Sequence, residues 1–169
     1  YVVPLDSLKG VLTYAEAVLP GYSSRELFFS TYICHPSMAN NELSGPLIST
    51  WLCALLTGMR RRYTYRFVLA PETIGSLVYL SKHGEHLKAN MDAGYVVTCA
   101  GNDGPFTYKR SRRGDTVADR AATHVLRHAV AGREARVLDF FPSGSDERQY
   151  CSPGFALPVG SLMRSIYGT

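Results

Sequence analysis

Four stretches of the chain are apolar at nearly every position, rather than at every second position. They are also rich in β-branched and aromatic residues. This combination is typical of strands that are buried on both faces of a sheet. We therefore predict buried strands at residues 26–34, 63–71, 93–101 and 157–165.

Two longer stretches carry apolar residues at helical spacing. The first, residues 41–59, has Pro46 near its start and Gly58 near its end, where these residues are favoured in helices. The second, residues 116–132, stops at Gly132. We predict a helix in each. The recurring apolar positions are Leu47, Trp51, Ala54 and Leu55 in the first helix, and Val117, Ala121, Val125 and Leu126 on one face of the second.

The remaining segments give weaker patterns. Residues 8–21 alternate around turn residues, which predicts a hairpin or a strand pair. Residues 73–90 predict a short helix followed by an amphipathic tail, and residues 107–114 a short strand or a loop. Residues 135–154 predict a short strand and then a polar loop.

Strands that alternate with helices indicate an α/β sandwich with a mixed, mostly parallel central sheet. With 169 residues the chain has the length of one domain, so we treat residues 1–169 as a single domain. The chain begins with Tyr1 and stops at Thr169, just after a strand-like stretch. We expect it to be a fragment that lacks N- and C-terminal parts.

The formal charge of +4 comes largely from two basic clusters, at residues 59–66 and 108–115. Such clusters can bind the phosphates of a nucleic acid, or they can be the solvent-exposed end of a helix and an exposed loop. The arginines show neither helical-face spacing nor interleaved aromatic side chains, which favours the solvated alternative. We therefore expect no nucleic-acid partner.

Cys34, Cys53 and Cys99 lie within apolar stretches, and no cysteine–histidine spacing of a zinc finger occurs. We expect these three to be buried, reduced thiols, which indicates a reducing compartment and a cytoplasmic location. No stretch reaches the ~18 apolar residues of a membrane span, so we expect no membrane partner.

His35 stands at the end of a predicted strand, and Asn41 and Glu42 follow shortly before a predicted helix. An imidazole nitrogen and a carboxylate oxygen together suit zinc or a similar divalent ion. The alternative for Glu42 is a carboxylate favoured by the helix dipole, and the alternative for Asn41 is a helix cap. Spacing alone leaves both alternatives open.

Glu72 follows Pro71 at the end of another buried strand. A partly desolvated carboxylate has a raised pKa, which suits a general base. The alternative is a charge at a helix N-terminus. In α/β sheets ligands gather at the carboxyl ends of strands, so His35 and Glu72 are expected at one edge.

A third candidate group lies in residues 144–150, where Asp146, Glu147 and Arg148 follow one another. These charges could bind a substrate amine or carboxylate through charge-assisted hydrogen bonds. A solvated turn is the equal alternative. His124 and His128 have the i, i+4 spacing of a metal pair, but without an HExxH pattern we expect surface residues.

Three motifs, "CHPSMANNELSG", "APETIGS" and "GSDERQYCSPG", occur in this order along the chain. Together they resemble the aminopeptidase-like domain of bacterial proteins associated with polysaccharide biosynthesis. That domain is similar to zinc aminopeptidases and glutamate carboxypeptidases. The resemblance covers nearly the whole chain and implies a three-layer α/β/α sandwich of the phosphorylase and zinc-peptidase type.

The resemblance also implies roles for single residues. His35 matches a zinc ligand, Asn41 stands where an aspartate bridges two zinc ions, and Glu42 is next to it. Glu72 matches the general base, while Thr73 and Thr98 stand where two further ligands are expected. A last histidine ligand is expected beyond the end of the chain. The Asp146 loop matches the substrate-pocket loop of the peptidases.

Two functions follow as hypotheses. The first is a zinc-dependent aminopeptidase-like hydrolase, with one or two zinc ions, that cleaves a peptide or amide bond by metal-activated water. Its substrate would be a small peptide or an amide-containing metabolite. The alternative is a metal-poor, non-catalytic binding domain in polysaccharide or secondary-metabolite biosynthesis. Whether the chain forms a homo-oligomer is left open.

Overall fold

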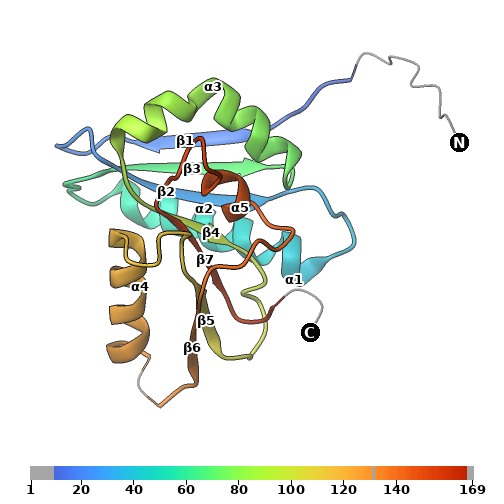
Figure 1. Cartoon of the computed structure of the whole chain (residues 1–169), viewed down its shortest axis with the longest axis vertical. Coiled ribbons are helices and arrows are strands. Elements are labelled where there is room, and N and C mark those ends of the chain that lie inside the picture. The colour runs from blue at the N-terminus through green and yellow to red at the C-terminus, as the bar shows by residue number, and fades with distance from the viewer. Residues whose placement is uncertain (1–9, 131, 167–169) are drawn as a thin grey trace, which may run out of the picture.

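The computed structural model describes residues 10–130 and 132–166, and a seven-stranded sheet forms the centre of this part (Figure 1). The strand order is β1-β3-β2-β4-β7-β5-β6. Neighbouring strands run parallel except in the β1–β3 and β5–β7 pairs. The strands are β1 (Ala15–Leu19), β2 (Glu26–Tyr32), β3 (Thr64–Ala70), β4 (Met91–Val97), β5 (Phe106–Lys109), β6 (Ala135–Leu138) and β7 (Val159–Met163).

Helices cover both faces of the sheet, which confirms the predicted mixed α/β sandwich (Figure 1). On one face lie α3 (Ile74–Asn90) and α5 (Glu147–Tyr150), on the other α2 (Ser44–Thr57) and α4 (Val117–His128). Alternating β2 side chains identify the faces, since Phe28 contacts Tyr79 of α3 and Tyr150 of α5, whereas Thr31 lies against Gly45 of α2. The short helix α1 (Ala39–Glu42) follows β2.

The larger hydrophobic core lies between the sheet and α3 and α5. Phe28, Val96, Tyr79 and Tyr150 are fully buried there. A smaller cluster under α4 contains Tyr108, Ala122 and Leu126. Both clusters fill the space beside the central strands, so the carboxyl ends of those strands are held in fixed positions.

The four predicted buried strands are confirmed as β2, β3, β4 and β7, each within two residues of the predicted start. The predicted hairpin at residues 8–21 is wrong in its described part: β1 is one strand, and it pairs with β3 across the sequence. Residues 8 and 9 lie outside the described part. Residues 74–90 form one helix instead of a short helix with a tail. The predicted polar loop contains α5.

Both predicted amphipathic helices exist, but the predicted apolar face of α2 points outward, and of the four positions predicted on the face of α4 only Leu126 is buried. Leu47 and Trp51 of α2 are 68% and 66% exposed, and its buried positions include Ser44, Gly45 and Ser49. A Cβ at position 45 would overlap with the backbone carbonyl of Val97, so only glycine allows α2 to lie this close to the sheet. In α4, Val117 and Val125 are likewise exposed, and Ala118, Ala122 and Leu126 are buried.

The cysteines are all free, and Cys99 is buried as predicted. Cys34 is exposed and Cys53 is half-buried, so the prediction of burial is wrong for these two. Cys34 follows the end of β2, where the chain leaves the sheet and loses its cover. Within residues 10–130 and 132–166, no helix combines the length and the apolarity needed to cross a membrane.

Candidate functional site

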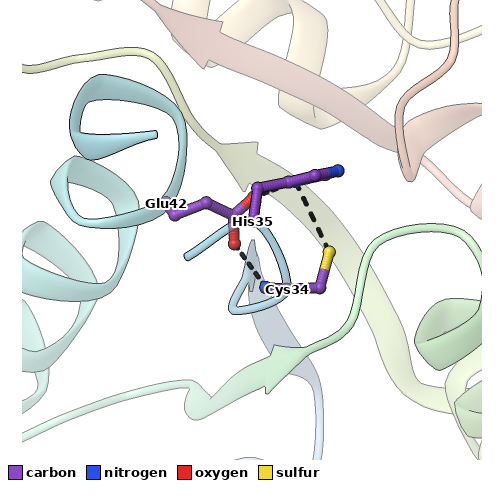
Figure 2. A group of neighbouring side chains, drawn as sticks. All are labelled: Cys34, His35 and Glu42. Carbon is purple, nitrogen blue, oxygen red and sulfur yellow. Dashed lines mark hydrogen bonds and ion pairs between the residues drawn. The ribbon is translucent and has the colours of Figure 1, made fainter. Parts of the chain in front are cut away.

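The loop after β2 brings His35 and Glu42 together (Figure 2). The Glu42 carboxylate has a partner on each oxygen: Oε1 lies 2.5 Å from His35 Nδ1, and Oε2 accepts a hydrogen bond from the Cys34 backbone N–H at 2.5 Å. Helix α1 places Glu42 seven residues after His35, and the turn at Pro36 and Ser37 folds the chain back. Glu42 is therefore fixed as the orienting group of the imidazole.

The second imidazole nitrogen points to another strand end. His35 Nε2 lies 3.8 Å from Glu72 Oε2. A neutral imidazole that donates from Nδ1 to Glu42 keeps its lone pair on Nε2. The hydrogen bond with Glu42 raises the pKa of His35, although partial burial opposes it, and the negative charges of Glu42 and Glu72 add to the rise.

Glu72 lies two residues after the end of β3, beyond Pro71, and is partly buried. Burial raises the pKa of its carboxyl group, and the nearby His35 lowers it in part. The Glu72 N–H donates to Cys34 Sγ at 3.1 Å. Its neighbour Thr73 has a φ of 62°, a strained conformation for a β-branched residue, and strained residues gather at functional sites.

Asp146 holds the strained segment in place. Its Oδ1 accepts hydrogen bonds from the Thr73 N–H at 2.7 Å and from Ser76 Oγ at 3.1 Å. Its Oδ2 is buried and has no hydrogen-bond partner among the described residues. Burial raises the pKa of Asp146 to about 7, and the two hydrogen bonds oppose this rise only in part.

Asn41 lies in α1 directly before Glu42 and is 6% exposed. Its Oδ1 is buried without a hydrogen-bond partner in the described part of the chain, and its Nδ2 donates to Cys99 Sγ at 3.6 Å. The hydroxyl of Thr98 is already engaged, since it donates to the Asn41 carbonyl at 3.2 Å. Asn41 thus offers an oxygen atom without a hydrogen-bond partner, whereas the Thr98 hydroxyl directs its proton to a backbone carbonyl.

The three residues predicted to bind substrate have different surroundings. Asp146 and Glu147 are fully buried, and Arg148 is exposed. Glu147 forms an ion pair with Lys109 and accepts a hydrogen bond from Ser161 Oγ at 2.8 Å. Both carboxylates therefore have internal partners beneath the site, and substrate contact by these residues stays a prediction.

A cleft of about 320 Å³ opens at these strand ends. Its polar lining includes Asn41, Glu72 and Lys109, and its apolar lining includes Phe141 and Met163. Lys109 is not among the residues predicted for the site, because the basic cluster at residues 108–115 is expected to be solvated. The signal was the strand pattern, because a lysine inside a short strand next to the buried Tyr108 must bring its charge to a partner.

The donor atoms fit one divalent cation better than two. His35 Nε2 and the unpartnered Asn41 Oδ1 are an imidazole nitrogen and an amide oxygen that one zinc ion could share, and Glu72 Oε2, 3.8 Å from His35 Nε2, lies beside them without being needed as a ligand. Cys34, His35 and Glu42 also offer three donor atoms within 4.8 Å of one another. Two ions would need further carboxylates, and the residues at those positions are the neutral Asn41, Thr73 and Thr98.

Cys34 is a poor candidate for a nucleophile. Its Sγ lies 3.5 Å from His35 Nδ1, but that nitrogen is bound to Glu42. Partial desolvation of the sulfur raises the pKa of the Cys34 thiol, the hydrogen bond from the Glu72 N–H opposes this rise, and the negative charges of Glu42 and Glu72 add to it. A thiol with a raised pKa holds its proton at neutral pH and reacts slowly.

The chain is similar to known proteins. A protein of Clostridium acetobutylicum, named as a polysaccharide biosynthesis protein with an aminopeptidase-like domain, is 48% identical over 170 residues. The match covers 99% of this chain and 38% of that protein, so the chain spans well under half the length of its curated relative.

Solved structures agree in fold. A crystal structure described as a peptidase of Clostridium acetobutylicum has a TM-score of 0.87 at 48% identity, over 92% of this chain and 36% of that one. A zinc aminopeptidase of Bacillus subtilis has a TM-score of 0.72 at 11% identity, over 92% of this chain and 42% of that one. The second likeness shows a shared fold alone.

The family profile matches the full length of the chain, residues 1–169. Together with the relative at 48% identity and the aminopeptidase-type fold, this match confirms the resemblance seen in the three sequence motifs. The chain belongs to the family described as Domain of unknown function (DUF4910) and carries an aminopeptidase-like fold.

Proposed function

We propose that this domain is a zinc-dependent aminopeptidase-like hydrolase that cleaves a peptide or amide bond, with one zinc ion per chain. The observation that carries the proposal is the pairing of His35 and Glu72. An imidazole fixed through Nδ1 by a carboxylate directs a free Nε2 at a second, half-buried carboxylate 3.8 Å away. A metal-binding histidine in proteins is commonly held in this way.

His35 Nε2 and Asn41 Oδ1 would hold the ion, with Glu42 orienting His35 through its own hydrogen bond. Glu42 lies close enough to Cys34 and His35 to contribute an oxygen atom as well. When bound, zinc supplies a Lewis acid that polarises the amide carbonyl and lowers the pKa of water.

Glu72 would move the proton. Its burial raises the pKa of the carboxyl group, so it can accept a proton from water and deliver it to the leaving amine. The bond that breaks is the amide C–N bond, and the water oxygen forms the new bond to the carbonyl carbon. Asp146 would keep the Glu72–Thr73 segment in its strained conformation through the bond to the Thr73 N–H.

The cleft supports a small substrate. A volume of about 320 Å³ accommodates a short peptide or an amide-containing metabolite. Apolar walls at Phe141 and Met163 would contact an apolar group next to the amide. We also propose a cytoplasmic location, which the four free cysteines suit.

One observation favours the metal-poor binding domain as a second candidate. Asn41, Thr73 and Thr98 are neutral, and the Thr98 hydroxyl already donates to a backbone carbonyl. A site with few anionic ligands binds zinc weakly. In that case the cleft would bind the same class of small molecule without cleaving it.

Zinc binding and hydrolysis separate the two candidates. Isothermal titration of the chain with zinc is expected to give about one site per chain, and His35→Gln is expected to abolish it. His128→Gln, which changes an exposed histidine on α4, is the matched control and should bind as the wild type does. No zinc binding by the wild type would favour the binding domain.

Glu72→Gln tests the base. The variant is expected to retain the zinc site and to hydrolyse a panel of aminoacyl and peptidyl amides about 10²–10⁴-fold more slowly. Equal rates in the wild type and Glu72→Gln would contradict the role of Glu72. Hydrolysis that persists at full rate after zinc is removed would contradict the metal-assisted mechanism.

A further inference from the structure

A second hollow lies apart from the cleft, beside α4 and the loop that precedes it. It has a volume of about 290 Å³ and is lined by Arg110, Asp115, Arg120, Thr123, His124 and Arg127, with Asp119 beneath. None of its lining residues lines the cleft that contains Glu72. The sequence predicts a solvated loop and a surface helix here, and neither prediction explains why the surface is concave.

The charge of the hollow is positive. Three arginines and two aspartates line it. The carboxylate of Asp119 is already surrounded by donors: Oδ1 accepts from the Ser111 N–H at 2.7 Å and from Tyr108 at 2.8 Å, and Oδ2 accepts from the Thr116 N–H at 2.8 Å. These bonds offset much of its charge, whereas Arg127 has no hydrogen bond or ion pair within the described part of the chain.

Two lining residues have polar atoms that lack partners. Arg110 Nε and Thr123 Oγ1 are shielded from solvent, and neither has a hydrogen-bond partner among the described residues. The same guanidinium uses Nη1 to donate to Asp139 at 3.1 Å. A buried donor without an acceptor is unfavourable, so an oxygen-bearing ligand in the hollow would stabilise both groups.

We propose that this hollow binds one phosphate group of a small phosphorylated molecule. Guanidinium groups bind phosphate oxygens through paired N–H donors, and the hollow is lined by Arg120 and Arg127 from α4 and by Arg110 from the loop after β5. The Thr123 hydroxyl adds a neutral donor. The site is independent of the proposed hydrolase activity, because it shares none of that site's residues.

The shape of the hollow argues for a small molecule instead of a nucleic acid. Its volume suits one phosphate group with part of a metabolite attached. No phenylalanine, tyrosine or tryptophan lines it, so bases would find no stacking platform. A nucleic acid would instead follow a series of phosphate contacts, with a steep dependence of affinity on salt.

The test is a calorimetric titration of the chain with inorganic phosphate and with pyrophosphate, repeated on variants. Arg127→Gln is expected to weaken phosphate binding roughly tenfold, since it removes a charged donor. Thr123→Val, which keeps the shape of the side chain, is expected to weaken it about threefold. Arg60→Gln is the matched control, because Arg60 is an exposed arginine outside the hollow and its loss is expected to change little.

Amide chemical shifts on adding phosphate should move within residues 110–127 and stay constant around His35 and Glu72. Equal weakening by Arg127→Gln and Arg60→Gln, or unchanged binding in Thr123→Val, would overturn the proposal. Tighter binding of a 20-nucleotide single strand than of pyrophosphate, with a steep salt dependence, would also overturn it and indicate a nucleic-acid surface.

Discussion

Asp146 combines a fully buried carboxyl group with an oxygen atom, Oδ2, that has no hydrogen-bond partner among the described residues. The pKa of this group is raised from 3.8 to about 7, chiefly by burial. Between these values the unfolded chain releases the proton that the folded chain retains. The free energy of unfolding therefore falls as the pH rises through this range.

Asp146→Asn removes this titration and keeps an oxygen for the bonds from Thr73 and Ser76. Relative to the wild type, the variant is expected to gain stability as the pH rises from about 4 to about 8, by on the order of 2–4 kcal/mol. Urea unfolding at several pH values measures the difference in the free energy of unfolding between the variant and the wild type. For Asp139→Asn, at an exposed carboxylate, the difference from the wild type should not change with pH. A difference that is also constant with pH for Asp146→Asn would contradict the role of Asp146.

Glu42→Gln tests the orienting role of Glu42 at the same scale. A glutamine cannot accept both the Cys34 N–H and the His35 Nδ1–H, so His35 loses its fixed orientation. Under the proposed function we expect zinc affinity to fall about 10–100-fold. Titration calorimetry measures the loss, and Glu85→Gln on the exposed side of α3 provides the control. An unchanged affinity would show that His35 needs no orientation by Glu42.

At the scale of elements, helix α2 is held by close approach to the sheet and not by an apolar stripe. Ser44 Oγ accepts a hydrogen bond from the Ala100 N–H at 2.9 Å and donates to the Asn40 carbonyl at 2.5 Å. Gly45 follows, in contact with Thr31 and Val97. The Ser-Gly pair of the "NELSG" motif therefore links α1, α2 and the loop after β4, which fixes the edges of the cleft.

Gly45→Ala is expected to destabilise the protein by about 1–3 kcal/mol, because the added methyl group overlaps with a backbone carbonyl that cannot move freely. For a domain of this size the melting temperature should fall by roughly 2–4 °C per kcal/mol. Gly58→Ala, where nothing lies within 4 Å of the new atom, should have little effect. Equal melting temperatures for the two variants would mean that α2 can shift outward at no cost.

These contacts explain what the sequence could and could not predict. The strands β2, β3, β4 and β7 were predictable because burial on both faces leaves a continuous apolar stretch. The meeting of His35 and Glu72 followed from their places at strand ends. The outward stripe of α2 was not predictable from periodicity, since periodicity shows that a helix has two faces but not which one the sheet accepts. Partners such as Lys109 and Glu147 depend on contacts between distant segments.

At the scale of the whole molecule, one ionic network joins four elements. Arg66 of β3 donates to both oxygens of Glu26 on β2, at 2.7 and 2.9 Å, and forms an ion pair with Glu16 on β1. His86 of α3 lies 2.8 Å from Glu26. The network lies at the amino end of β2, opposite the cleft, and it connects α3 to the edge of the sheet.

Arg66→Gln is expected to cost about 3–5 kcal/mol, because it removes the guanidinium that pairs with both Glu16 and Glu26 in a largely buried place and leaves only His86 beside Glu26. Arg136→Gln removes an exposed ion pair with Glu134 and should cost less than about 1 kcal/mol. Chemical denaturation of both variants provides the comparison. Similar losses would mean that solvent screens the Arg66 network as well as it screens the surface pair.

The strand order has a consequence for synthesis of the chain. β7 is the last of the seven strands to be made, yet it lies between β4 and β5 and is the sole link between the two halves of the sheet in the described part of the chain. Strands β1 to β4 can pair while the ribosome is still translating, because domains acquire structure from the N-terminal side first. The β5–β6 pair joins the rest of the sheet through β7, so the nascent chain exposes two open sheet edges until β7 emerges, and a chaperone that shields strand edges would act in this interval.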